Sequence, residues 1–182
     1  MPGGLHALHM TIAEKSSVVW KQTLVHTVSV SFLTERYTTV ITLEVMLSDS
    51  ILFSCADGTI RDLAALRGTY RIIPETKKAV EILFDALKEM EVSKVNIFLD
   101  EPVSNSGRLK ALVAEVGESF PFEVDIQVLK EVDRELWTKE NVITSDSRII
   151  DHCRSWVNLM KKCVEKYGAD LIQVWDCENR RG

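Results

Sequence analysis

The chain has 182 residues, 46% of them apolar and 27% charged, which is typical of one globular domain and not of a disordered or fibrous chain. No apolar run reaches the roughly 18 residues of a membrane span, and no basic stretch followed by an apolar core marks a secretory signal, so we expect a cytoplasmic protein without a membrane partner. The net charge of -5 argues against a protein that coats nucleic acid by electrostatics alone, but it is compatible with a nuclease, because metal-binding carboxylates are themselves negative.

Strand-like and helix-like patterns alternate from about Val40 onward. In chain order we expect a strand over 51–55, a helix over 75–91, a strand over 94–99, a helix over 106–117, a strand over 122–129, a strand over 141–144, one long helix over 147–167 capped by Gly168, and a strand over 171–175.

Strands separated by helices predict an α/β fold, in which a mainly parallel central sheet carries helices on both faces in three layers. No repeat or linker divides the chain, but residues 1–34 are poorly patterned. We therefore expect an N-terminal segment over 1–34 and one α/β domain over 35–182. Sheets of this kind bind ligands at the carboxyl ends of their strands.

Aspartates lie at those strand ends. Three predicted strands run into Asp57, Asp100 and Asp146, while Asp62 follows Asp57 by five residues and Asp133 lies shortly after the strand over 122–129. Carboxylates that share one rim of a sheet repel each other unless a cation or a proton offsets their charge, and Mg²⁺ or Mn²⁺ prefers such oxygen ligands. The alternative is that each aspartate only caps the helix that follows it.

The segment after Asp100 predicts a phosphate site. A helix would open at Ser104, Asn105 and Ser106, and Arg108 and Lys110 would fall in its first turn, where the helix dipole disfavours cations. A bound anion would remove that conflict. Arg61 is a further cation that could hold phosphate or pair with the acidic rim, and the alternative for the whole segment is a solvated helix cap.

The run Asp57-Gly58-Thr59 is similar to the first motif of the haloacid-dehalogenase phosphatases, but the nucleophilic aspartate two residues earlier is replaced by Cys55. A phosphatase would therefore depend on that thiol. The four cysteines form no Cys-x-x-Cys pair and have no histidine at ligand spacing, so we expect reduced structural thiols and not a zinc site or a disulfide.

Four runs together resemble an uncharacterised, largely archaeal family with a PIN-like fold: Asp57–Asp62, Gly68–Arg71, Leu99–Lys110 and Thr144–Ser147. The aspartate that closes a central strand and the later Thr-Ser-Asp also resemble the NYN branch of the PIN-like ribonucleases. The resemblance implies that Asp100 and Asp146 are metal ligands, that Asp57, Asp62 or Asp133 completes the site, and that one or two divalent ions activate water against an RNA phosphodiester.

The chain departs from this family where a strand usually ends in Asp-Gly-Phe/Tyr-Asn before a helix like the one that begins near Val40. The corresponding run here is Glu35-Arg36-Tyr37-Thr38, so Glu35 would supply the carboxylate, and Arg36 could neutralise it. The sequence thus predicts a nuclease that uses Mg²⁺ or Mn²⁺ to hydrolyse single-stranded RNA. It leaves open a catalytically inactive module that binds RNA or protein on the same fold, and a homo-oligomer.

Overall fold

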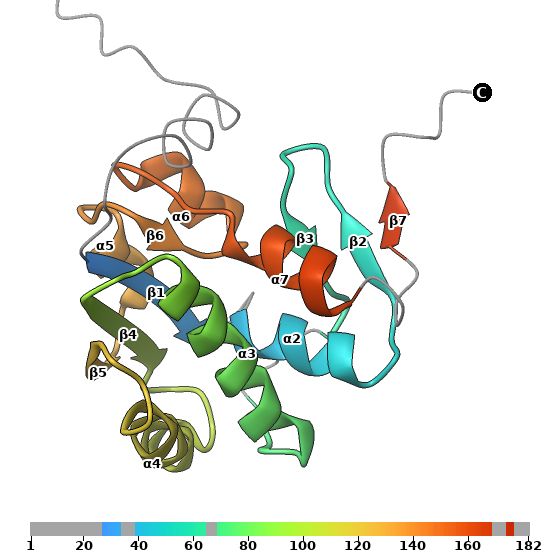
Figure 1. Ribbon diagram of the computed structural model, residues 1–182. Coiled ribbons are helices and arrows are strands. Elements are labelled where there is room, and N and C mark those ends of the chain that lie inside the picture. Colours follow the sequence, from blue (N-terminus) through green and yellow to red (C-terminus); the bar gives the residue numbers. More distant parts are fainter. Residues whose placement is uncertain (1–26, 34–38, 65–68, 169–173, 177–182) are drawn as a thin grey trace, which may run out of the picture.

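The computed structural model describes residues 27–33, 39–64, 69–168 and 174–176 (Figure 1). In chain order its elements are β1 (Thr27–Leu33), α2 (Thr39–Leu47), β2 (Leu52–Ser54), β3 (Ile60–Arg61), α3 (Glu75–Glu89), β4 (Lys94–Asp100), α4 (Ser106–Gly117), β5 (Glu123–Leu129), α5 (Val132–Leu136), β6 (Val142–Ile143), α6 (Ser147–His152), α7 (Leu159–Tyr167) and β7 (Val174–Asp176). Within these ranges, none of the helices is long and apolar enough to cross a membrane.

The main sheet has four parallel strands in the order β5-β4-β1-β6. Alternate residues of β4 enter two separate cores, because Ile97 and Leu99 pack on one side of the sheet and Phe98 on the other. The first core takes in residues of α2, α3, α4 and α7, and the second takes in residues of α5 and α6. The predicted α/β fold, with a parallel sheet covered on both faces, is confirmed.

A second, smaller sheet has the order β3-β2-β7 and lies beyond α2 and α7 from the main sheet (Figure 1). Its antiparallel β2–β3 hairpin turns at Gly58, whose φ of 78° suits a residue without a Cβ. Asn158, the N-cap of α7, donates from Nδ2 to the Gly58 oxygen over 2.6 Å. The hairpin tip is therefore fixed to the helix that separates the two sheets.

Strand β1 lies between β4 and β6, although the sequence predicts no element there. Val28, Val30 and Phe32 are fully buried. The alternation of Val28, Val30 and Phe32 with Thr27, Ser29 and Ser31 is the period-two pattern of a strand. The main sheet thus takes in residues before the predicted domain start at 35.

The single helix predicted over 147–167 is wrong. Helix α6 ends at His152, and α7 begins at Leu159. Between them the chain runs beside β6, where Trp156 bridges to Val142 and Val157 N donates to the Val142 oxygen over 2.8 Å. Ile149, Cys153, Trp156, Met160 and Val164 are nevertheless buried as the helical pattern predicts, because this extended segment also turns Trp156 into the core.

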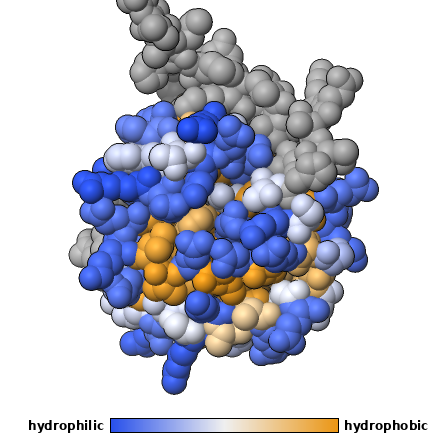
Figure 2. Space-filling model, turned by 90° about the vertical axis from the view of Figure 1, so that its left-hand side faces the viewer, coloured by the Kyte–Doolittle hydropathy of each residue, from blue (hydrophilic) through white to orange (hydrophobic). Residues whose placement is uncertain are grey.

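β5 forms one outer edge of the main sheet, and all of its residues except the exposed Glu123 are half-buried. The view in Figure 2 faces the side of the molecule on which β5 lies, and hydrophobic atoms gather there inside a ring of hydrophilic ones.

Candidate functional site

Asp100 and Asp146 both follow strands toward the carboxyl edge of the main sheet. Val30 of β1 pairs with Ile97 of β4 on one side and with Ile143 of β6 on the other. Each aspartate is the third residue after its paired isoleucine. Both aspartates therefore lie toward the carboxyl end of the main sheet, beyond strands that flank β1 on its two sides.

Asp100 is 7% exposed and closes β4. Its Oδ1 accepts a hydrogen bond of 3.3 Å from the backbone N–H of Val132, the first residue of α5. This contact places the next residue, the half-buried Asp133, on the same rim. The structure thus brings the main chain of three predicted metal ligands, Asp100, Asp133 and Asp146, to one end of the sheet.

Asp146 is both a helix cap and a buried carboxylate with an unused oxygen. Its Oδ1 accepts from the backbone N–H of Arg148 over 2.8 Å, so it caps α6 as the alternative predicts. The residue is only 1% exposed, and its Oδ2 is buried with no hydrogen-bond partner among the described residues. The neighbouring Ser145 hydroxyl is likewise buried, with no hydrogen-bond partner among the described residues. An unpaired buried carboxylate oxygen costs free energy that a bound cation could offset.

Asp57 is engaged by its own hairpin. Its Oδ2 lies 2.5 Å from a terminal guanidinium nitrogen of Arg61, and its Oδ1 accepts from the N–H and the hydroxyl of Thr59. Burial alone would raise the pKa of Asp57, but the bonds from Arg61 and Thr59 outweigh it and hold that pKa below its usual value. Arg61 also donates from Nε to the Ser145 oxygen over 2.9 Å. The predicted phosphate ligand is thus occupied within the protein.

Asp62 lies beside α2. Its Oδ2 accepts from the Thr42 hydroxyl over 2.8 Å, and its Oδ1 accepts from the Ala64 N–H over 2.9 Å. Burial raises the pKa of Asp62. Glu35 lies outside the described residues. Across residues 27–33, 39–64, 69–168 and 174–176, no three His, Cys, Asp or Glu side chains form a group that could hold a metal ion.

The predicted phosphate segment begins on the same edge of the sheet as Asp100, whose backbone oxygen accepts from Val103 N over 3.3 Å. Asn105 has a φ of 64° and donates from Nδ2 to the Tyr70 oxygen over 2.6 Å, while α4 begins at Ser106. The side chain of Asn105, the N-cap residue, makes no capping hydrogen bond to α4. Ser104, Arg108 and Lys110 are exposed, so this helix start is open to solvent.

Sequence reasoning missed a buried polar cluster centred on Glu44 of α2, which is 5% exposed. Its Oε1 accepts a 2.6 Å hydrogen bond from the Tyr70 hydroxyl and another from the Thr76 hydroxyl. Burial raises the pKa of Glu44 against the opposite effect of these two bonds. The signal was present, because Glu44 is the one charged residue in the otherwise apolar and hydroxyl-bearing helix of residues 39–47.

Comparisons with known proteins place these observations in a family. No solved structure gives a significant match. Uncharacterized protein MJ0935 from the archaeon Methanocaldococcus jannaschii is 33% identical over 133 residues, which cover 72% of this chain and 64% of that protein, so the match spans less than two thirds of the relative. Residues 31–162 match the family described as a domain of unknown function, DUF5616. The chain therefore belongs to the DUF5616 family.

Proposed function

We propose that this protein is a metal-dependent ribonuclease with a PIN-like fold, which hydrolyses phosphodiester bonds in single-stranded RNA at the rim of its main sheet. The observation that supports the proposal is the buried Oδ2 of Asp146, which has no partner among the described residues, at the sheet end toward which the strands before Asp100 and Asp146 both run.

The donor set fits a hard divalent cation. Mg²⁺ is usually held by only one or two protein carboxylates and completes its shell with water and substrate phosphate. Asp100 and Asp146 would hold it, and Asp133 is the third carboxylate at the same sheet end. A bound ion of this kind supplies an activated water and offsets phosphate charge.

The remaining steps belong to residues of this chain. The start of α4, where the N-cap side chain makes no capping bond, would present backbone N–H groups and the positive end of the helix dipole on the rim. Arg108 and Lys110 are exposed there and are free to reach a phosphate. Arg61 has a different role in this proposal, since it holds Asp57 and the Ser145 oxygen and thereby positions Asp146.

The test compares Asp100→Asn and Asp146→Asn with wild-type protein on end-labelled single-stranded RNA, with Mn²⁺ and with EDTA. We expect each variant to lose about 100-fold or more of the Mn²⁺-dependent cleavage, the scale of loss when a catalytic metal site is disrupted. The control is Asp49→Asn, which changes an exposed aspartate after the far end of α2. Wild-type rates in both rim variants would end the proposal.

A second candidate is a module that binds RNA without cleaving it. It is favoured by the absence, within the described ranges, of a three-ligand group, and by the neutralisation of Asp57 through Arg61. This candidate predicts that labelled RNA is retained by wild-type protein in EDTA, and that Mn²⁺ adds neither cleavage nor thermal stability.

A further inference from the structure

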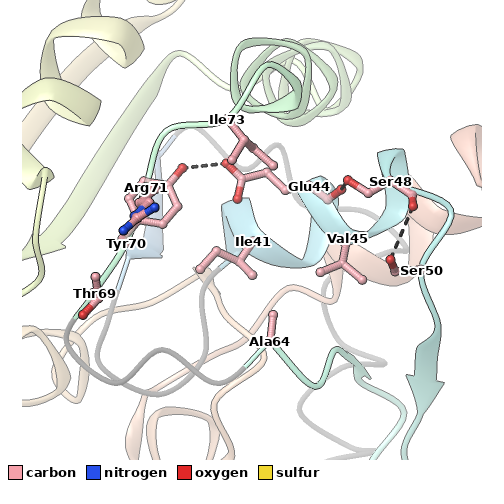
Figure 3. Close-up of a pocket in the computed structure, with 10 residues that line it drawn as sticks. All are labelled: Ile41, Glu44, Val45, Ser48, Ser50, Ala64, Thr69, Tyr70, Arg71 and Ile73. Atoms are coloured by element: carbon pink, nitrogen blue, oxygen red, sulfur yellow. Dashed lines mark hydrogen bonds between the residues drawn. The ribbon is translucent and has the colours of Figure 1, made fainter.

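A cavity of about 330 Å³ opens between α2 and residues 69–73 (Figure 3). Its volume is at the lower end of the range for small-ligand sites, about 300–1,000 Å³. The walls are partly apolar, with Ile41, Val45 and Ile73, and the polar lining includes Glu44 and Arg71. None of the carboxylates predicted from the sequence to hold a metal ion lines it.

The polar wall of this cavity includes the carboxylate of Glu44, of which only one oxygen accepts hydrogen bonds from the part of the protein that the structure describes. Tyr70 and Thr76 both donate to Oε1 of Glu44, and no donor among the described residues reaches Oε2. Figure 3 shows the second oxygen of Glu44 directed into the space between Tyr70 and Ile41. A ligand N–H group placed there would complete the hydrogen bonding of a buried acidic group.

The hydroxyl groups of the lining also present acceptors. Ser48 donates its hydroxyl proton to the main-chain oxygen of Glu44 over 2.8 Å, and Ser50 donates to the Ser48 oxygen over 3.3 Å. Their protons are thus turned into the protein, which leaves the oxygen lone pairs as the groups available to a ligand. The cavity therefore selects a flat or apolar group that carries several N–H donors.

The cavity is joined to the rim through Tyr70. Its hydroxyl donates to Glu44, and its main-chain oxygen accepts from Asn105, the N-cap residue of α4. A chain with a phosphate at the start of α4 could thus place an adjoining base in the cavity. Arg71, an exposed cation of the lining, is available to the phosphate on the near side of that base.

We propose that this cavity binds a guanine base, with Glu44 accepting hydrogen bonds from its N–H groups. Guanine presents two adjacent donors, N1–H and N2–H, to a carboxylate. Adenine and cytosine place an acceptor nitrogen beside their amino group, and uracil has a single N–H between two carbonyl oxygens, so each would set an acceptor against Glu44. The source of the base as part of an RNA substrate rests on the proposed function, whereas the chemistry of the cavity does not.

The first experiment measures binding of GMP, AMP, CMP and UMP to the full chain in EDTA by isothermal titration calorimetry. We expect GMP to bind about 10-fold or more tighter than the others, the discrimination expected of one paired base edge. Glu44→Gln should abolish this preference, because its amide oxygen still accepts from Tyr70 and Thr76 but its NH₂ opposes the guanine donors. Glu115→Gln, an exposed glutamate on α4, is the matched control and should bind GMP like wild type.

Absence of a GMP preference in wild-type protein, or its survival in Glu44→Gln protein with an unchanged melting temperature, would overturn the assignment. If Glu44→Gln does not fold, Arg71→Ala replaces it, and unaltered GMP affinity in that variant counts against the phosphate contact and the site.

Mapping of RNA cleavage distinguishes the two sources of the base. Cuts beside guanosine in wild type that lose their base preference in Glu44→Gln assign the cavity to RNA, and GMP binding without any base preference assigns it to a free guanine nucleotide. Because binding is measured in EDTA, loss of cleavage in the rim variants leaves this result unaffected.

Discussion

Arg61 donates from Nε to the main-chain oxygen of Ser145 over 2.9 Å, and this bond joins the β2–β3 hairpin to the residue immediately before Asp146. The same guanidinium contacts Asp57, and the side chains of the pair are only 16% and 17% exposed. The hairpin of the small sheet therefore helps to fix the rim of the main sheet. A substitution of Arg61 should alter the position of Asp146.

We expect Arg61→Met to lower the free energy of unfolding by about 1–2 kcal/mol, because Asp57 is left partly buried without its cation. Urea denaturation followed by circular dichroism measures this loss. Lys77→Met is the control, since its ion pair with Glu115 is exposed on both sides and such pairs contribute little. Equal stability of wild type and Arg61→Met would contradict the structural role of Arg61.

Mn²⁺ should raise the melting temperature of wild-type protein, since a ligand that binds only the folded state adds about 2.7 kcal/mol at 100 times its dissociation constant. Asp146→Asn should abolish that rise and leave the metal-free melting temperature nearly unchanged, because asparagine is an equally good N-cap for α6. Differential scanning calorimetry with and without Mn²⁺ separates the two effects, and Asp49→Asn should respond like wild type. A full Mn²⁺ response in Asp146→Asn would remove Asp146 from the metal site.

The pH dependence of stability should reveal the raised pKa of the Glu44 carboxyl. Burial raises its pKa above the ordinary value of 4.5, and nearby Glu75 and Asp62 act in the same direction, so the folded carboxyl holds its proton more tightly than the unfolded one. The resulting contribution to stability is complete below the unfolded pKa and is lost as the pH rises through the folded pKa. In Glu44→Gln this loss is absent.

The free energy of unfolding of Glu44→Gln, relative to wild type, should therefore increase as the pH rises above the unfolded pKa of the carboxyl. Urea titrations at a series of pH values measure it. Glu118→Gln, which alters an exposed carboxyl, should show a flat difference. A difference that falls with pH would mean that the folded state prefers the ionised form of Glu44.

Trp156 holds the segment that leads to Asp146 through a hydrogen bond to Thr144. It is 1% exposed, and its Nε1 donates to the Thr144 oxygen over 2.8 Å. We expect Trp156→Phe to lower the free energy of unfolding by about 2–3 kcal/mol, through the lost volume and the unpaired carbonyl. Leu63→Ala, at a side chain that is 76% exposed, should change stability little, and a similar effect of the two substitutions in thermal unfolding would refute this role of Trp156.

The elements with a strong period were predictable. Helix α4 has the predicted bounds 106–117, and α3, β4 and β5 each lie within two residues of theirs, because amphipathic spacing reports which side faces the core. Strand β1 was missed because three of its seven residues are small and polar and interrupt the run of apolar residues. The break after His152 was missed because the buried positions of the extended segment 153–158 continue the helical spacing.

The expected placement of Asp100 and Asp146 on one rim followed from a rule about parallel strands, and the register of β4, β1 and β6 directs both segments toward the same sheet end. The partners of Asp57 and Arg61 could not be predicted in the same way, since the Ser145 contact joins residues 84 positions apart. The left-handed backbone of Asn105 and its bond to Tyr70 likewise depend on how two loops meet. Local spacing reports which side of an element is buried, but it does not report which distant group lies opposite.

The two outer edges of the main sheet are not equivalent. On the β6 side, the segment after α6 takes up both backbone groups of Val142, through Ser155 and Val157, so a foreign strand finds nothing to pair with at that residue. On the β5 side, no strand in the described ranges covers the edge, and the surface there is partly hydrophobic (Figure 2). A further strand that joined the main sheet would therefore be expected beside β5 and not at Val142.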